Sequence, residues 1–342
     1  MWFIFALICL LGWGTADLFY KKSSDENDRY SHLKIAVWVG IVMGVCAFGF
    51  LPFAEHGVGV LNISNLLKYS PASLGYIVSM VIGYAGLRYM EVSIISPVQN
   101  TSGALSAIVM TLWFLATAED KLGAISDETG LTFGEKSGLE LFNNILILGG
   151  VAIICVGVVL LGVIEQKLSF KERSDISAGL EKPEDRKHRL GLLAFVFPIL
   201  YCLFDTVGTA ADGIILDEES GIGLGEIDVI VIYGLTFFLA GIVSWIFLWI
   251  KEKKPYNPFT KHEIATKGAA ACFEEFGQVF YVYAMADNGV IAAPMIAAYC
   301  IVSVILSRIF LKEKLHKNQY IAVAIVIIGI ISLGISDGIS LL

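Results

Sequence analysis

Long apolar runs alternate with short polar stretches along the whole chain. A helix that crosses a membrane needs about 20 mostly apolar residues, and ten segments meet that requirement. We expect them at residues 2–20, 33–53, 72–90, 92–116, 143–164, 190–216, 228–250, 268–286, 289–311 and 319–337. The connections are too short for a separate soluble domain, so the pattern predicts an all-α integral membrane bundle of ten transmembrane helices.

The last five segments repeat features of the first five in the same order. Matching residues are Gly14 and Gly208, Tyr84 and Tyr281, and Pro97 and Pro294. Val151-Ala152-Ile153 also recurs as Val323-Ala324-Ile325. An odd number of spans in each half places the halves in opposite orientations, which is typical of secondary transporters. We therefore expect two inverted five-helix repeats, over 1–164 and 190–342, joined by a basic cytoplasmic linker over 165–189.

The composition supports a single membrane domain. Hydrophobic residues make up 56% of the chain and charged residues only 16%, whereas soluble domains carry about 25% charged residues. The mean hydropathy is +0.73. The first segment lacks the basic start and small-residue cleavage site of a secretion signal, so we expect it to be a retained helix.

Basic residues are concentrated on one side of the predicted bundle. Of the 24 lysines and arginines, all but Lys68, Lys121 and Lys136 fall in alternate connections. Such connections face the cytoplasm, so we expect a plasma-membrane protein with both termini outside the cytoplasm. The opposite side is acidic, with Asp127-Glu128 after the fourth segment and Asp217-Glu218-Glu219 after the sixth. These stretches are either solvated turns or an outer gate that attracts cations.

Several polar groups are expected inside the membrane, where an ionisable side chain costs roughly 2.5–3.5 kcal/mol on insertion scales. The candidate substrate- or proton-binding residues are Trp13, Asp17, Gln99, Asn100, Tyr201, Asp205, Asp212, Glu274, Glu275, Gln278, Tyr281 and Tyr299. Asp205 and Asp212 are seven residues apart and therefore lie on one helix face. No lysine lies at that depth to pair with the carboxyls, which favours proton binding or a positively charged ligand.

Each of these groups also has a structural interpretation. Asp205 is either a cavity-lining group or a protonated, packed acid, and either glutamate is a ligand group or a hydrogen-bonding partner of a neighbouring helix. Gln99 and Asn100 flank Pro97, where carbonyls freed by the proline need partners. Binding and scaffold roles therefore both stay open for these residues.

The chain has no recognisable metal, cofactor or catalytic motif. The six cysteines have no metal-ligand spacing, none of the five histidines falls within an expected span, and we expect the cysteines to be reduced packing residues. Neither a P-loop nor a hydrolase motif occurs. We expect a protein that is not an enzyme and holds no cofactor. Its expected partners are a small-molecule substrate, protons and the lipid bilayer, without nucleic acid, in a monomer or homodimer.

The segment AAPMIAAYCIVSVILSRIFLKEKLHKNQYIAVAIVIIGIISLGI resembles the last two helices of the drug/metabolite transporter superfamily, EamA-like branch. Its short turn, Leu311-Lys312-Glu313-Lys314-Leu315, and the opening WGTADLFYKK are similar to the family pattern. The first-half counterpart, SPVQNTSGALSAIVMTLWFLATAEDKL, is a weaker match. The resemblance implies that helices 1, 3, 4, 6, 8 and 9 line a central cavity. It also implies cytoplasmic termini and a short fourth connection, whereas this chain shows outward termini by charge and a longer connection.

Together these features predict a secondary transporter that works by alternating access. Unpaired carboxyls favour a cationic or zwitterionic metabolite and proton coupling. The alternative is a sugar or nucleoside importer of the same fold. There Trp13, Tyr201, Tyr281 and Tyr299 would stack on the ligand, and the acids would accept hydrogen bonds from its hydroxyl groups.

Overall fold

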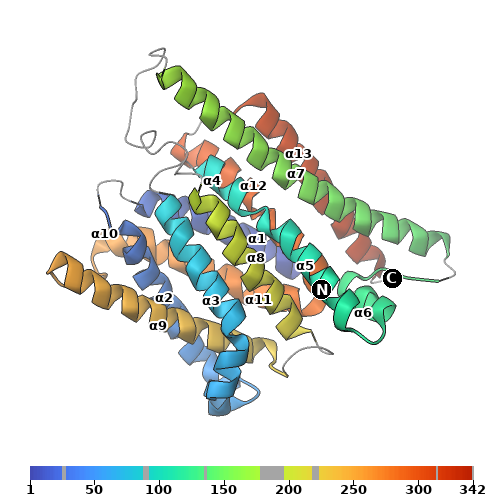
Figure 1. Cartoon of the computed structure of the whole chain (residues 1–342), viewed down its shortest axis with the longest axis horizontal. Coiled ribbons are helices and arrows are strands. Elements are labelled where there is room, and N and C mark those ends of the chain that lie inside the picture. Colours follow the sequence, from blue (N-terminus) through green and yellow to red (C-terminus); the bar gives the residue numbers. More distant parts are fainter. Residues whose placement is uncertain are drawn as a thin grey trace.

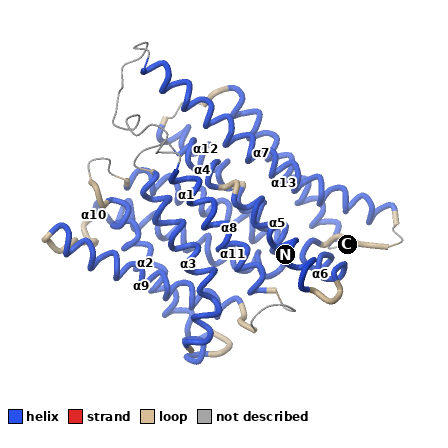
Figure 2. The backbone as a smooth tube through the Cα atoms, viewed as in Figure 1, coloured by secondary structure: helices blue, strands red, loops and turns tan. Residues whose placement is uncertain are grey.

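A computed structural model describes residues 1–24, 28–87, 92–134, 137–177, 196–217, 223–312 and 315–340. These residues form helices joined by short loops, and none of them lies in a β-strand (Figure 2). The first half contains α1 (Trp2–Ser23), α2 (Ser31–Phe50), α3 (Ile63–Gly86), α4 (Val92–Gln99), α5 (Ser102–Thr117), α6 (Lys121–Thr129) and α7 (Gly138–Ser177). The second contains α8 (Val196–Leu216), α9 (Glu226–Glu252), α10 (Lys261–Glu263), α11 (Ala269–Ala297), α12 (Tyr299–Leu306) and α13 (Lys317–Ser340).

The membrane-spanning character predicted from the sequence is confirmed. Among the described residues, 8 helical stretches are long and apolar enough to cross a bilayer. One of them, Lys261–Leu311, has 51 residues and covers both the eighth and the ninth expected segments. Asn288 interrupts its helical geometry, with φ −155° and ψ 66°. The third expected segment corresponds to α3, which is long enough but less apolar than these 8.

The start of α3 differs from the prediction because Pro71 lies inside the helix instead of at its beginning. The helix starts at Ile63, where the Asn62 side chain accepts a hydrogen bond of 3.1 Å from the backbone N–H of Ser64. A proline inside a helix leaves the carbonyl four residues earlier without its usual donor. Here the Ser70 hydroxyl donates to that carbonyl, on Leu67, at 2.8 Å.

Two expected spans are broken a few residues after a proline. The fourth divides into α4 and α5 at Asn100 and Thr101, and the ninth divides at Ala298. Pro97 precedes the first break and Pro294 the second. The Asn100 amide donates to the Ser96 carbonyl at 2.7 Å, and the backbone N–H of Asn100 donates to the same carbonyl at 3.0 Å.

Four helix pairs form the most extensive contacts of the bundle: α1 with α11, α3 with α8, α2 with α9, and α7 with α13 (Figure 1). Each pair has a glycine on both helices at its closest approach, namely Gly12 with Gly277, Gly75 with Gly208, Gly40 with Gly241, and Gly150 with Gly329. A Cβ atom on Gly75, for example, would lie 2.9 Å from Cα of Gly208. Small residues therefore allow these backbones to touch.

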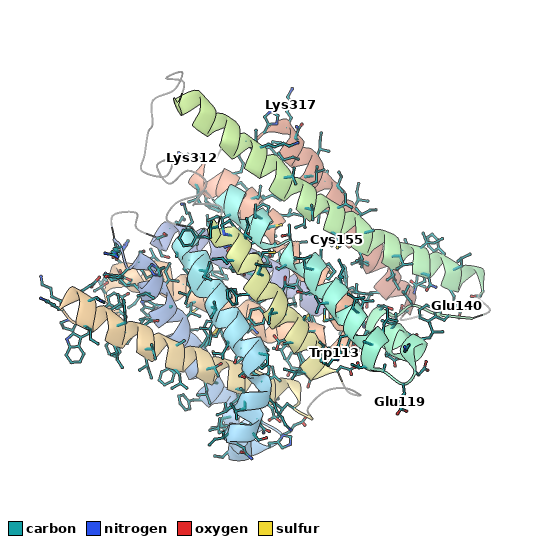
Figure 3. All side chains as sticks on the ribbon, viewed as in Figure 1. Trp113, Glu119, Glu140, Cys155, Lys312 and Lys317 are labelled. Carbon is teal, nitrogen blue, oxygen red and sulfur yellow. The ribbon has the colours of Figure 1, made fainter. Side chains whose placement is uncertain are left out.

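The outer faces of the bundle are apolar and its ends differ in charge. Leu148, Trp249 and Ile328 are among the large apolar side chains exposed on α7, α9 and α13, as expected of surfaces in lipid. Figure 3 places Lys312 and Lys317 at one end of the molecule, and Glu119 and Glu140 at the other. We call these the basic end and the acidic end. Both termini and α6 lie at the acidic end (Figure 1).

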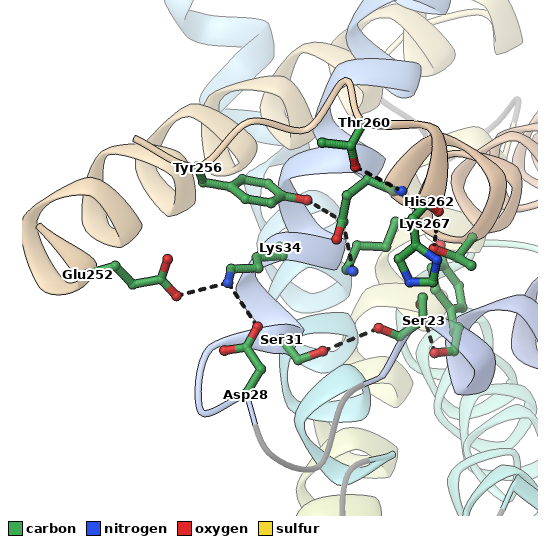
Figure 4. A network of polar contacts seen from close by, with 12 residues as sticks. Ser23, Asp28, Ser31, Lys34, Glu252, Tyr256, Thr260, His262 and Lys267 are labelled. Atoms are coloured by element: carbon green, nitrogen blue, oxygen red, sulfur yellow. Dashed lines mark hydrogen bonds and ion pairs between the residues drawn. The ribbon is translucent and has the colours of Figure 1, made fainter. Parts of the chain in front are cut away.

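Side-chain contacts tie the two halves together at the basic end (Figure 4). The ammonium group of Lys34 on α2 lies 2.9 Å from carboxylate oxygens of both Asp28 and Glu252. Further along the connection after α9, Glu263 accepts a hydrogen bond of 2.6 Å from Tyr256 and pairs with Lys267 at 2.7 Å. We call these residues the basic-end network.

Candidate functional site

A hollow lies inside the bundle among six helices: α1, α3, α4, α8, α11 and α12. Its lining residues are Trp13, Asp17, Tyr20, Met80, Gly83, Tyr84, Leu87, Gln99, Tyr201, Glu274 and Tyr299. These helices correspond to the expected segments 1, 3, 4, 6, 8 and 9, the set that the family resemblance implies. The hollow has a volume of about 20 Å³, which is room for about one water molecule.

Trp13 lines the hollow and makes contacts with three residues of α11 and α12. Its indole N–H donates to the Glu274 carbonyl at 3.1 Å. Its ring stacks on Tyr281 with centroids 5.1 Å apart, and meets the edge of Tyr299 at 5.7 Å. Aromatic contacts of this geometry hold a ring in place beyond the effect of burial alone. These contacts join the candidate residue Trp13 of α1 to α11 and α12.

Asp17 presents a carboxylate to the hollow from one turn further along α1. Its Oδ2 atom accepts hydrogen bonds from the hydroxyl groups of Ser96, at 2.7 Å, and Ser303, at 2.6 Å. The two donors come from α4 and α12, on the two broken spans. None of the salt bridges found among the described residues involves Asp17.

Glu274 is the second carboxyl that lines the hollow. Its side chain is 2% exposed, and its Oε1 atom has no hydrogen-bond partner among the described residues. Tyr20 and Tyr84 stand nearby, with their hydroxyl oxygens 3.3 Å apart and their ring centroids 4.7 Å apart. The hollow thus combines two acids with several aromatic faces, and none of the described residues that line it is a lysine or an arginine.

The other candidate residues lie outside this lining. Asp205 accepts a hydrogen bond of 2.6 Å from Ser102, and Asp212 accepts one of 2.7 Å from Tyr69. Glu275 does not line the hollow, and its side chain interacts with Cys46 on α2. Gln278 is buried, and neither its amide oxygen nor its nitrogen has a partner among the described residues. The lining includes six of the predicted site residues: Trp13, Asp17, Gln99, Tyr201, Glu274 and Tyr299.

Sequence reasoning missed five lining residues, Tyr20, Met80, Gly83, Tyr84 and Leu87. Two of them had a signal. Tyr20 lies seven residues after Trp13 and three after Asp17, on the same face of a helix. Tyr84 is the repeat partner of the candidate Tyr281. Met80, Gly83 and Leu87 carry no polar group that marks a site in an apolar helix, so only packing identifies them.

Part of the acidic stretch after the fourth segment is neither solvated nor a simple turn. Asp120 caps the N-terminus of α6 by accepting from the backbone of Leu122 and Gly123. Glu128, near the other end of that helix, is 5% exposed. Burial, together with the nearby Asp217 carboxyl, raises the pKa of Glu128 to about 8. Glu218 and Glu219 of the other acidic stretch lie outside the described residues.

None of the six cysteines forms a disulfide in this structure, and three of them, Cys9, Cys202 and Cys300, are buried packing residues, whereas Cys272 is exposed. The described residues contain no group of three or more His, Cys, Asp or Glu side chains arranged to hold a metal ion.

The fold and the hollow define a multi-pass membrane protein with a polar site enclosed by helices. Comparison with known families identifies it further: residues 219–335 match the EamA-like transporter family. That family is part of the drug/metabolite transporter superfamily, and the match lies in the second half of this chain. Members of the family are membrane transporters and not enzymes.

Solved structures share the same overall fold. Among 25 similar chains, one crystal structure superposes on 98% of this chain and 96% of its own length, with a TM-score of 0.56. Its sequence is only 12% identical, so the likeness concerns the helical arrangement alone. No curated protein matches the sequence.

Proposed function

We propose that this protein is a secondary active transporter that moves a small cationic or zwitterionic metabolite across the plasma membrane by alternating access, coupled to protons. The observation that carries the proposal is the hollow, in which Asp17 and Glu274 face aromatic rings and no described lysine or arginine. Ionisable groups at membrane depth mark ligand or proton pathways. A cation would gain from the two carboxylates and from the faces of the surrounding rings.

The proposal includes ten membrane-spanning helices in two inverted repeats. Helix packing supports it, because exchanging the halves maps the α1–α11 pair onto α8–α3, and maps α2–α9 and α7–α13 onto themselves. The two broken spans, α4–α5 and α11–α12, support it in the same way. Inverted repeats around a central site are suited to rocking between two access states.

The small volume of the hollow agrees with a contracted state of a transporter. Small-ligand pockets usually measure about 300–1,000 Å³, so a metabolite requires the walls to separate. The nearest contacts on the basic side join α1 to α3: Lys21 donates to the Leu87 carbonyl at 2.7 Å, next to the Tyr20–Tyr84 pair. We propose that ligands reach the hollow from the basic end when these contacts part, and that this end is cytoplasmic.

A sugar or nucleoside importer is the second candidate. One observation favours it: Asp17 already accepts two hydrogen bonds from hydroxyl groups. A ligand hydroxyl can replace a serine hydroxyl in such a contact, while Trp13 and Tyr299 stack on a flat ring. This candidate predicts binding of uncharged ligands.

Ligand binding to purified protein and uptake into proteoliposomes test the proposal. Thermal shifts would be compared for choline, a zwitterionic amino acid, a sugar and a nucleoside. Accumulation of the labelled ligands would then be followed with and without an imposed pH gradient.

We expect a charged ligand to bind and accumulate, and Asp17→Asn or Glu274→Gln to weaken its binding. Exposed Asp127→Asn is the matched control. Binding of uncharged ligands alone would favour the second candidate, and no gradient-driven accumulation would reject proton coupling.

A further inference from the structure

Asp212 on α8 is the most deeply buried carboxyl group among the candidates, and it lies away from the hollow. Its side chain is 0% exposed and it is absent from the hollow lining. Oδ1 accepts the hydrogen bond from Tyr69 on α3. Oδ2 is buried and has no hydrogen-bond partner among the described residues.

The ionisable groups around Asp212 are phenols and acids. Tyr69 and Tyr76 come from α3, Tyr233 from α9 and Tyr281 from α11, and all four interact with one another or with this carboxyl. The Tyr76 hydroxyl contacts the hydroxyls of Tyr281 and Thr209.

Two acids complete the surroundings of Asp212. Asp205 lies two turns away on the same helix. Glu128 of α6 lies close to Gly289 of α11, and Gly289 lies close to Gly213, the residue that follows Asp212. Among the described residues, those that interact with Asp212 include no lysine, arginine or histidine.

A carboxylate buried without a counterion costs several kcal/mol, so such a group takes up a proton instead. The phenols supply hydrogen bonds but no positive charge. In the conformation seen here, the site is therefore suited to a neutral carboxylic acid. Exposing the same group to water removes the cost of the charge and lets the proton leave to solvent.

The position of Asp212 links this proton to opening at the acidic end. The α3–α8 crossing at Gly75 and Gly208 lies one turn from Asp212 on α8 and between Tyr69 and Tyr76 on α3. Tyr69 and Asp212 both lie on the acidic side of this crossing. A separation of the two helices on that side breaks the Tyr69–Asp212 hydrogen bond and admits water to the carboxyl.

We propose that Asp212 is a proton-binding site separate from the substrate hollow, protonated while the acidic end is closed and ionised when that end opens. This inference rests on the proposed function, and it assigns the substrate and the coupled proton to different carboxyl groups. Asp17 and Glu274 meet the substrate, while Asp212 carries the coupled proton. Tyr69 is a positioning residue that holds the carboxyl in the closed arrangement.

Infrared spectroscopy of the purified protein tests the proton site without any substrate. At neutral pH we expect the difference spectrum between the wild type and Asp212→Asn to show a carboxylic-acid C=O band that the variant has lost. Tyr69→Phe should shift the frequency of that band, because it deletes the hydrogen bond of 2.7 Å to Oδ1. Exposed Asp127→Asn should leave the band unchanged. A difference spectrum between the wild type and Asp212→Asn that shows no lost carboxylic-acid band would overturn the proposal.

Transport of labelled choline in proteoliposomes tests the separation of roles. We expect Asp212→Asn to retain exchange of choline at equal pH on both sides. Under a pH gradient, the accumulation of choline by this variant should fall to the level that the choline gradient alone produces. If Asp212→Asn accumulated choline under a pH gradient as well as the wild type does, Asp212 would not be the site of the coupled proton. Loss of choline exchange in folded Asp212→Asn would also contradict this assignment. A wild-type protein that moves no choline would instead contradict the cationic substrate, while the infrared result still decides the proton site.

Discussion

Trp13 occupies the space that a side chain at position 277 would need. A Cβ atom on Gly277 would lie 2.3 Å from Cδ1 and 2.7 Å from Nε1 of the indole. Glycine at this crossing of α1 and α11 therefore allows the ring to reach the Glu274 carbonyl, one turn earlier on α11. The position of Trp13 in the hollow therefore depends on the absence of a side chain at position 277 in the facing helix.

The substitution Gly277→Ala should displace Trp13 and damage the hollow. Overpacking of this kind costs about 1–3 kcal/mol, so we expect a lower thermal midpoint together with weaker ligand binding. Gly49→Ala on α2 is the control, because a Cβ there meets nothing within 4 Å. Wild-type binding by folded Gly277→Ala would show that the position of Trp13 is unimportant for the ligand.

Asp17→Asn should reduce the affinity for a cationic ligand at least about tenfold, equivalent to about 1.4 kcal/mol. The change keeps the shape of the side chain but removes its negative charge. The double change of Ser96→Ala and Ser303→Ala keeps the charge and removes both hydroxyl donors, so its effect should be smaller. Binding titrations measure both. A larger loss in the serine variant would indicate that orientation matters more than charge.

The stability of the protein should depend on pH through Glu128. Its pKa is raised from 4.5 to about 8 in the folded protein, so folding favours the protonated form. The stability associated with this group is therefore greatest below about pH 4.5, declines as the pH rises toward 8, and stays low above it. At most, the change is roughly 1.4 kcal/mol for each pKa unit of the shift.

Glu128→Gln should remove that part of the pH dependence. Thermal midpoints in detergent at pH 5 and pH 8 should differ less in this variant than in the wild type. Asp127→Asn, at an exposed neighbouring position, should behave like the wild type. Equal pH dependence in Glu128→Gln and wild type would show that this carboxyl is not the source.

Lys34→Met should weaken the basic-end network (Figure 4). Lys34 is 16% exposed and bridges Asp28 to Glu252, so its loss leaves two partly buried carboxylates without their shared donor. We expect a cost of about 1.5–3 kcal/mol, as for hydrogen bonds to charged groups. Thermal unfolding of Lys34→Met, Glu252→Gln and the double variant would measure the coupling. Exposed Lys254→Met is the control, and additive effects would argue against a direct interaction.

Much of the helical pattern follows from local sequence. The uninterrupted apolar stretches of α1, α9 and α13 begin and end within three residues of their predicted limits. Pro97 and Pro294 marked the two spans that break. The start of α3 was wrong because the Ser70 hydroxyl compensates the carbonyl that Pro71 leaves free, and a single hydroxyl carries little weight in a hydropathy pattern.

Hydropathy and polar spacing established that this is a helical membrane protein and which helices carry acids and aromatic rings, because both properties depend on residues close together in the chain. They could not separate Asp17 and Glu274, which share one hollow, from Asp212, which meets Tyr69 elsewhere. That division depends on how α1, α3, α8 and α11 cross at their glycines. Residues far apart in the chain form those crossings, and contact between two backbones leaves no periodic signal in either helix.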